Sequence, residues 1–143
     1  MWPTDRTKRL HLELVIHVIV SETEGLPVRA RLSYESADPL AVRLDFRDSP
    51  ADAPPWFLSR DLLFAGLRAP AGEGSVRVWP PCACHGSETV RIALTGNGGA
   101  AVLYVPAAEF GAWLKETFTA VPAGTESDHL GLDDILERVL RSG

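Results

Sequence analysis

The sequence has few of the residues that support covalent or metal chemistry. Only two of its 143 residues are cysteines, and both lie in one short loop, at Cys82 and Cys84. Two cysteines so close together are too few for the disulfide framework that staples many small secreted domains. We therefore expect a reducing, cytoplasmic location.

Lysine is also scarce. Lys8 and Lys115 are the only lysines, and the other twelve basic residues are arginines. Acidic residues outnumber basic ones and give a formal net charge of −5, which argues against non-specific binding of nucleic acid or membranes by the whole surface. Because arginine makes planar, bidentate contacts with carboxylates and phosphates, the positions of the arginines matter more than their number.

Long hydrophobic runs are missing as well. The apolar run from residue 10 to residue 20 is interrupted by His11, Glu13 and His17. No small-residue cleavage site follows it, so we expect no signal peptide. The longest uncharged stretch, residues 92–108, contains a Gly-Asn-Gly-Gly turn and a proline. It predicts a β-hairpin and not a membrane span, which needs about 20 apolar residues.

The sequence does contain a series of alternating segments. Apolar residues at every second position predict β-strands at residues 10–20, 28–34, 42–47, 56–58, 75–79, 90–94 and 101–105. Short turns between the first three strands favour an antiparallel meander. The first strand is apolar on both faces, and Val15 and Ile19 lie on its second face. We expect another sheet or another subunit to cover these two residues.

Three helices are predicted. A short helix has Ser59 as its N-cap, Asp61 near its positive end and Gly66 at its stop. A second helix has Pro106 in its first position and an apolar stripe after it. A last helix, within residues 132–140, repeats apolar residues at i, i+3, i+4 and i+7.

The length of the chain predicts one domain. We expect residues 1–9 to form a loose leader and residues 10–143 to form the domain. About seven antiparallel strands, one short inserted helix and two C-terminal helices make the fold class α+β.

The residues that could carry chemistry do not suggest a catalytic site. Cys82, Cys84 and His85 offer three soft ligands, but structural zinc sites usually combine two spaced pairs. They are a weak metal candidate, and an ordinary loop is the alternative. Ser59, Asp61 and His85 have the residue types of a hydrolase triad, but no nucleophile elbow surrounds the serine. We expect no catalytic residue, no bound metal and no cofactor.

The arginines are the more informative set. If the apolar residues face the core, six arginines fall on outward faces of strands: Arg29, Arg31, Arg43, Arg47, Arg77 and Arg91. Such a face is a candidate for binding single-stranded nucleic acid or an acidic protein partner. The alternative is a solvated face whose arginines pair with Glu13 and Asp45. Outward aromatic residues for base stacking are few, Trp79 being the main one, which counts against nucleic acid.

The chain resembles the SsgA-like family of actinobacterial sporulation and cell-division proteins. The resemblance is carried by LSYESADPLAV at residues 32–42, by the run at residues 56–80, and by VPAGTE at residues 121–126 before the last helix. The run at residues 56–80 is the most specific part, with RDLL near its middle and VRVWP at its end. Leu40, Cys82 and Cys84 depart from the residue types that are common in the family.

The resemblance implies a non-enzymatic protein of Whirly-like, two-sheet fold, related in architecture to single-stranded nucleic-acid binders and assembled as a homotrimer. It also implies a role in septum placement and spore-wall maturation through protein contacts, either with wall-synthesis proteins or with the tubulin-like division GTPase FtsZ. Such a protein would be recruited to division septa without inserting into the membrane. Within it, Val15 and Ile19 are the candidate oligomer contact.

Overall fold

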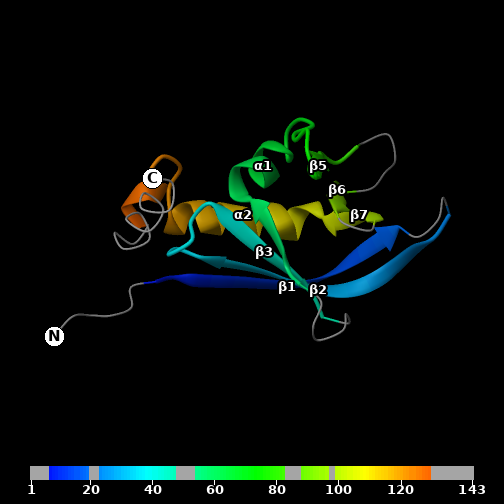
Figure 1. Cartoon of the computed structure of the whole chain (residues 1–143), viewed down its shortest axis with the longest axis horizontal. Helices are drawn as coiled ribbons and strands as arrows, with labels where there is room; N and C mark the ends of the chain where they lie inside the picture. The colour runs from blue at the N-terminus through cyan, green and yellow to red at the C-terminus, as the bar shows by residue number, and fades with distance from the viewer. Residues whose placement is uncertain (1–6, 20–22, 48–53, 83–87, 97–98, 130–143) are drawn as a thin grey trace, which may run out of the picture.

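The computed structural model describes residues 7–19, 23–47, 54–82, 88–96 and 99–129. This part of the chain contains seven strands, two α-helices and a short 3-10 helix (Figure 1). The strands are β1 (Arg9–Ile19), β2 (Gly25–Glu35), β3 (Ala41–Phe46), β4 (Trp56–Ser59), β5 (Val76–Trp79), β6 (Thr89–Gly96) and β7 (Gly99–Pro106). The helices are α1 (Arg60–Ala65), α2 (Ala107–Ala120) and the 3-10 helix η2 (Glu126–His129). The predicted strands and the first two predicted helices are confirmed.

All seven strands belong to one antiparallel sheet in the order β4-β3-β2-β1-β7-β6-β5. The predicted two-sheet arrangement is therefore wrong for the described residues. The reason is β1, which pairs along its whole length with β2 and also, through residues 17–19, with β7. This one strand joins the β1–β4 meander to the β5–β7 meander.

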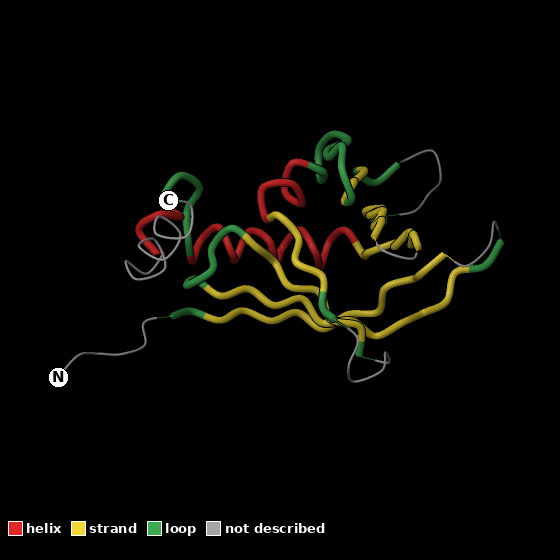
Figure 2. The backbone as a smooth tube through the Cα atoms, viewed as in Figure 1, coloured by secondary structure: helices red, strands yellow, loops and turns green. Residues whose placement is uncertain are grey.

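The sheet curls until its two ends approach each other. Trp56 at the start of β4 lies against β6, because a Cβ atom added to Gly96 would be 3.1 Å from the Trp56 ring. β4 is one edge of the sheet and β6 is next to the other edge. The result is a nearly closed barrel-like sheet. In Figure 2 the long β1–β2 pair runs along one side of the molecule, and both α-helices lie on the same side of it.

The core lies between the inward faces of the strands and α2. Inward residues alternate along each strand as the sequence predicts. Phe110, Trp113, Leu114 and Thr117 are the buried residues of α2. The buried apolar strand residues are Leu14, Ile16, Ala30, Leu32, Tyr34, Val42, Leu44, Leu58, Val78, Val90, Ile92, Leu94, Leu103 and Val105.

Local signals set the ends of α1. The Ser59 side chain accepts a hydrogen bond of 3.2 Å from the Leu62 N–H, which confirms the predicted N-cap. Gly66 is the C-cap, with an ordinary right-handed φ of −66°. Its glycine is needed for space and not for φ, because a Cβ atom there would overlap the Val78 side chain. Gly72 is different, since its φ of +96° favours glycine for conformational reasons.

Three boundaries differ from the prediction or fall outside the described residues. Pro106 is the N-cap of α2 and not its first residue, so the helix begins one position later than expected, at Ala107. Lys8 exchanges hydrogen bonds with Ser36, and β1 starts at Arg9, at the end of the expected leader. The predicted last helix, at residues 132–140, lies outside the described residues. No helix in the described part of the chain is long and apolar enough to cross a membrane.

Candidate functional site

The outer face of the sheet holds the predicted arginines in two separate groups. Arg29, Arg31 and Arg43 lie on β2 and β3, and Arg47 directly follows β3. Arg77 and Arg91 lie on β5 and β6. Because β1 and β7 separate the two pairs of strands in the sheet, the six arginines do not form one continuous patch.

Three arginines of the first group form ion pairs with carboxylates on the same face. Arg31 lies 3.2 Å and Arg47 3.8 Å from the same Glu13 oxygen. Arg43 donates two hydrogen bonds to Asp45, of 2.9 and 3.2 Å. These contacts follow from the register, which places Glu13, Arg31 and Asp45 side by side on three neighbouring strands. The pairing with Glu13 and Asp45 that the alternative interpretation predicts is therefore present for these three arginines.

The second group surrounds an indole ring. Arg91 is directly opposite Trp79 on the neighbouring strand, and its guanidinium carbon lies 4.4 Å from the centre of the Trp79 ring. Arg77 precedes Trp79 by two residues on the same face, at 5.4 Å from that centre. Both distances are within the range of cation–π attraction. The row continues across β7 and β1 through Tyr104 and His17.

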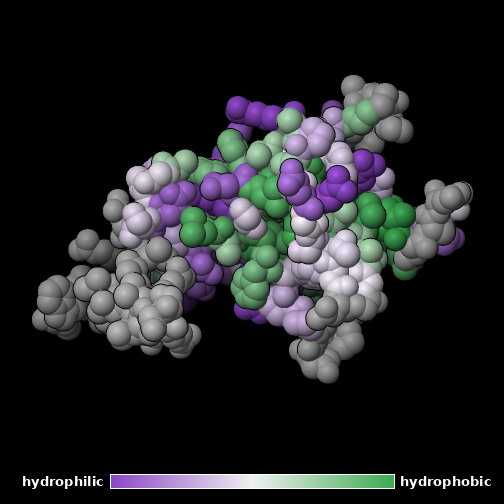
Figure 3. Space-filling view, turned by 45° about the horizontal axis from the view of Figure 1, so that its top comes forward, coloured by the Kyte–Doolittle hydropathy of each residue, from purple (hydrophilic) through white to green (hydrophobic). Residues whose placement is uncertain are grey.

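Apolar residues interrupt the polar outer face. Phe57 is 60% exposed and lies opposite Arg43 on the edge strand β4. Val15, one of the two candidate oligomer residues, is 45% exposed, and Ile19 is half-buried. No second sheet in the described part of the chain covers either residue. Figure 3 shows that green apolar and purple polar side chains are interspersed over one face of the molecule.

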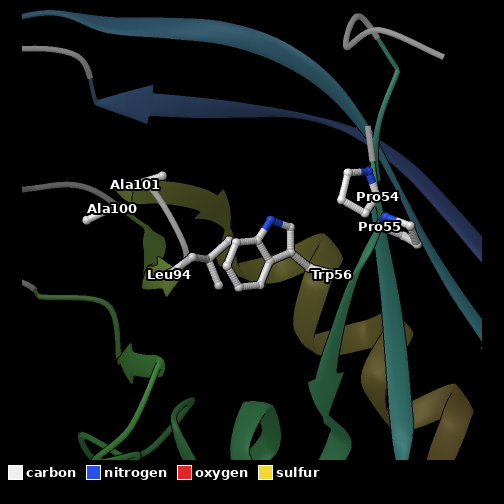
Figure 4. A pocket seen from close by; sticks show the side chains of 8 residues that line it. Pro54, Pro55, Trp56, Leu94, Ala100 and Ala101 are labelled. Carbon is white, nitrogen blue, oxygen red and sulfur yellow. The ribbon is translucent and has the colours of Figure 1, made fainter. Parts of the chain in front are cut away.

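A groove opens where the two ends of the sheet approach each other. Its volume is about 530 Å³, and it is lined by Pro54, Pro55, Trp56, Leu94, Gly96, Gly99, Ala100 and Ala101. In Figure 4 the Trp56 ring points from β4 across the opening toward Leu94 on β6. None of these side chains carries an acid, a base or a nucleophile. The groove is therefore suited to apolar contacts and not to proton transfer.

A smaller hollow lies on the outer face beside the first group of arginines. Its volume is about 270 Å³, and its lining includes Glu13, Val15, Arg29 and Arg47. It therefore combines charged groups with the exposed apolar side chain of Val15. Such a mixture of apolar and polar groups is common at protein–protein contacts.

Arg60 is a buried charge that was not predicted from the sequence. Only 1% of this residue is exposed. Its Nη1 donates to the backbone oxygens of Thr117 and Val121, at 2.9 and 2.8 Å, and its Nη2 donates to Glu126 at 3.1 Å. Its guanidinium also lies 3.9 Å from the centre of the Phe118 ring. One signal was present, because Arg60 and Leu63 are three apart and share a helix face.

The pKa values of two residues near Arg60 are shifted from their ordinary values. Backbone N–H groups of Glu126 and Gly124, together with the Arg60 guanidinium, lower the pKa of Glu126 below its ordinary value of 4.5. Burial raises the pKa of Tyr34 to about 12. Arg60 therefore holds α1, the end of α2 and the segment after α2 together as a structural anchor.

The remaining sequence candidates are not brought together. Ser59 acts as a helix cap, and Asp61 lies in the first turn of α1. Cys82 is disulfide-bonded, whereas Cys84 and His85 lie outside the described residues. Within the described residues, no group of three or more His, Cys, Asp or Glu side chains could hold a metal ion.

Taken together, these features define a small antiparallel barrel protein whose outer face mixes arginines, carboxylates and exposed apolar side chains. Residues 28–126 match the family described as "Streptomyces sporulation and cell division protein, SsgA". The chain belongs to this SsgA-like family.

The relatives cover nearly the whole chain. The sporulation-specific cell division protein SsgB of Streptomyces coelicolor is 44% identical over 128 residues, which are 90% of this chain and 93% of the relative. SsgB of Frankia casuarinae is 37% identical over 98% of this chain and 97% of its own length. The chain is therefore a homologue of the sporulation-specific cell division protein SsgB.

Solved structures agree with this relationship. One comes from a study of SsgB mutations that correlate with longitudinal cell division during sporulation of Streptomyces coelicolor. It superposes with a TM-score of 0.81 at 41% identity, over 89% of this chain and 99% of that chain. An SsgA-like sporulation-specific cell division protein from Thermobifida fusca superposes with a TM-score of 0.79 at 31% identity, over 94% of this chain and 98% of that chain.

Proposed function

We propose that the protein is a non-enzymatic adaptor of sporulation-specific cell division. It binds division or wall-synthesis proteins and thereby guides septum placement or septal wall synthesis. The observation that carries this proposal is the near full-length similarity to SsgB, at 44% identity over 90% of the chain. The mixed outer face supports it, because exposed apolar side chains rimmed by polar ones are typical of protein contacts.

The proposal includes a location and a partner class. The adaptor acts in the cytoplasm and is recruited to division septa, where the tubulin-like GTPase FtsZ or a wall-synthesis protein binds it. No cofactor is required for this role. The relatives are named as sporulation-specific cell division proteins, which supports an action of this chain at division septa.

The proposal also includes a homotrimer. Val15 is 45% exposed and lies on the outer face of the central strand β1. No second sheet among the described residues covers Val15 or Ile19, which supports another molecule as their cover. Burial of an exposed apolar side chain stabilises association by roughly 25 cal/mol per Å² of apolar surface removed from water.

The decisive test is the position of the protein in a septating cell. We expect a fluorescently tagged, full-length chain to form bands at sporulation septa, and a co-purification from the same cells to recover a division or wall-synthesis protein. A uniformly dispersed signal, or a co-purification that never recovers such a protein, would contradict the adaptor role.

The alternative is a single-stranded nucleic-acid binder that uses the arginine face. The ion pairs of Arg31, Arg43 and Arg47 with Glu13 and Asp45 count against it, because paired arginines do not release counterions from phosphates as unpaired ones do. Binding of this kind weakens steeply with salt. A gel-shift assay with single-stranded DNA at low salt tests it, and we expect no shift.

A further inference from the structure

The second arginine group differs from the first in its partners. No carboxylate of the described residues lies within salt-bridge distance of Arg77 or Arg91, and neither guanidinium donates a hydrogen bond to a described residue. Both side chains are exposed. What holds them is Trp79, whose ring centre lies 4.4 Å from Arg91 and 5.4 Å from Arg77. Two like charges are thus kept around one indole ring, and their N–H groups make no hydrogen bond to a described residue.

This arrangement is costly without a partner. Two cations close together repel each other, and the chain has more carboxylates than basic groups, yet no carboxylate of the described residues forms an ion pair with either of them. The indole ring offsets part of the repulsion and reduces the freedom of both long side chains. Arginines that are ordered before binding lose less conformational entropy when a ligand arrives. The pair therefore has the properties of a preformed anion-binding surface.

We propose that Arg77, Trp79 and Arg91, the "Arg–Trp–Arg surface", bind an acidic, extended segment of a protein partner. Each guanidinium binds one carboxylate through two N–H groups. In an extended segment, side chains at i and i+2 share a face and lie about 7 Å apart, which suits two guanidiniums around a single ring. The proposal rests on the adaptor function and names the chemistry of its partner.

Three observations favour an acidic peptide over a nucleic acid. The Trp79 ring already contacts two guanidinium groups, so it is poorly available as a stacking platform for bases. This surface offers two arginines of the described residues, whereas nucleic-acid binding uses a row of cations along many phosphates. A protein with net charge −5 also repels a long polyanion more strongly than a short acidic segment.

The segment lies over the face of the sheet and not along its edge. β5 is the edge strand, but the backbone of Val78 already exchanges two hydrogen bonds of 2.9 Å with Ala71. This contact blocks the addition of a further strand at that position. The partner segment therefore reaches the surface through side chains, across the row that leads to Tyr104 on β7.

A binding measurement on the purified full chain tests the proposal. The probes are a fluorescein-labelled peptide of alternating glutamate and serine, the matching glutamine–serine peptide and labelled single-stranded oligothymidine. We expect fluorescence anisotropy to show salt-sensitive binding of the glutamate peptide only. The double variant Arg77→Gln/Arg91→Gln weakens it by about tenfold or more, as expected for the loss of two charged contacts.

Arg43→Gln is the matched control. Arg43 is also an exposed arginine of the outer face but is bonded to Asp45, so we expect its loss to change the affinity by less than about twofold. Equal losses for the control and the double variant, or no binding of the glutamate peptide, would overturn the proposal. Preferential binding of oligothymidine would overturn it in favour of nucleic acid. Thermal melts check that each variant is folded.

The cellular readout separates this proposal from the adaptor role. If the tagged protein forms septal bands but the purified chain ignores the glutamate peptide, the adaptor role stands and the Arg–Trp–Arg surface is refuted. If the protein binds the peptide but never reaches septa, the surface stands and the adaptor role fails. We expect wild-type bands, and weaker bands for the double variant at equal protein level.

Discussion

Arg60 joins three parts of the chain through one guanidinium group. It donates to the carbonyls of Thr117 and Val121 at the end of α2, and to the side chain of Glu126 beyond it. Replacing it by alanine removes the side-chain donor to both carbonyls and the cationic partner of Glu126, although Thr117 O still accepts from the Val121 N–H and Glu126 from the Gly124 N–H. We expect Arg60→Ala to lower the free energy of unfolding by about 3–5 kcal/mol, because the loss of two charge-assisted hydrogen bonds to carbonyls and the cavity left by the side chain both destabilise the fold. Urea denaturation at neutral pH measures this loss.

Two variants control for the loss of charge and of bulk. Arg68→Ala removes an exposed arginine that lies over the Phe64 ring at 5.6 Å, and we expect it to cost less than about 1 kcal/mol. Arg60→Lys keeps the charge but cannot reach both carbonyls with a planar fork, so its stability should lie between wild type and Arg60→Ala. Similar stabilities for Arg60→Ala and Arg68→Ala would contradict the anchor role.

Tyr34 gives a pH-dependent signature of the same region. Its hydroxyl donates to the Pro39 carbonyl at 3.0 Å, and burial raises its pKa from 10.0 to about 12. Because the neutral form is favoured in the folded state, the stability that Tyr34 contributes is fully present below pH 10 and is lost as the pH rises toward 12. Alkaline unfolding should therefore begin in this range.

The measurement uses Tyr104→Phe, in which Tyr34 is the only tyrosine left. We expect the tyrosinate absorbance of the folded variant to appear with a midpoint near pH 12. Circular dichroism recorded in parallel shows whether the chain is still folded. Ionisation with a midpoint near the ordinary pKa of about 10, in a chain that remains folded, would show that Tyr34 is not buried as described.

At the scale of elements, α1 packs on β5 through a glycine. Val78 is fully buried, and a Cβ atom at Gly66 would overlap its side chain. We expect Gly66→Ala to destabilise the fold by about 1–3 kcal/mol through overpacking. In the double variant Gly66→Ala/Val78→Ala, the second change provides room for the new methyl group. The double variant should therefore lose less than the sum of the two single variants, by about 1 kcal/mol or more.

Gly74→Ala is the control for this cycle, because no atom lies within 4 Å of a Cβ atom placed there and its φ is not positive. We expect a change within about 0.5 kcal/mol, as is usual at the surface. Additive losses in the Gly66/Val78 cycle would show that the helix and the strand do not meet closely. Thermal or urea denaturation of all four variants decides the matter.

Local patterns predict the elements well because each depends on neighbouring residues. Alternation set the strands, Ser59 marked a helix start, and the β6–β7 pairing extends to Gly96 opposite Gly99 as the hairpin signal indicated. The number of sheets could not be predicted in this way. It depends on whether β1 pairs on both of its edges, and no alternation within β1 reveals which strands are its neighbours.

The same limit applies to the arginines. Alternation correctly assigned all six to the outer face, but their partners depend on strand order and register. Glu13 meets Arg31 because β1 and β2 pair in one particular register, and it meets Arg47, which follows β3, because β2 and β3 also pair in one register. Arg60 was missed for a related reason, since its partners lie 57 to 66 residues away. Contacts between residues distant in the sequence thus determine which arginines form ion pairs with carboxylates.

At the scale of the whole molecule, Val15 tests the proposed trimer. It is exposed on the central strand, opposite Arg29 on β2. Val15→Glu places a charge in the proposed contact, where an unpaired carboxylate is costly to bury. Within the monomer, the new carboxylate faces Arg29 and is solvated, so the fold should tolerate it. We expect analytical ultracentrifugation to show a trimer for wild type and a monomer for Val15→Glu.

Leu40→Glu is the matched control, because Leu40 is 49% exposed but lies in the turn before β3 and away from the outer face of β1. It should sediment as a trimer and melt within a few degrees of wild type, as expected for a change of about 1 kcal/mol or less. Val15→Glu should remain folded by circular dichroism, although loss of the subunit contacts lowers its melting temperature. A monomeric wild type would refute the trimer. A trimeric Val15→Glu would place the contact elsewhere, whereas dissociation of both variants would point to general loss of apolar surface rather than to the face of β1.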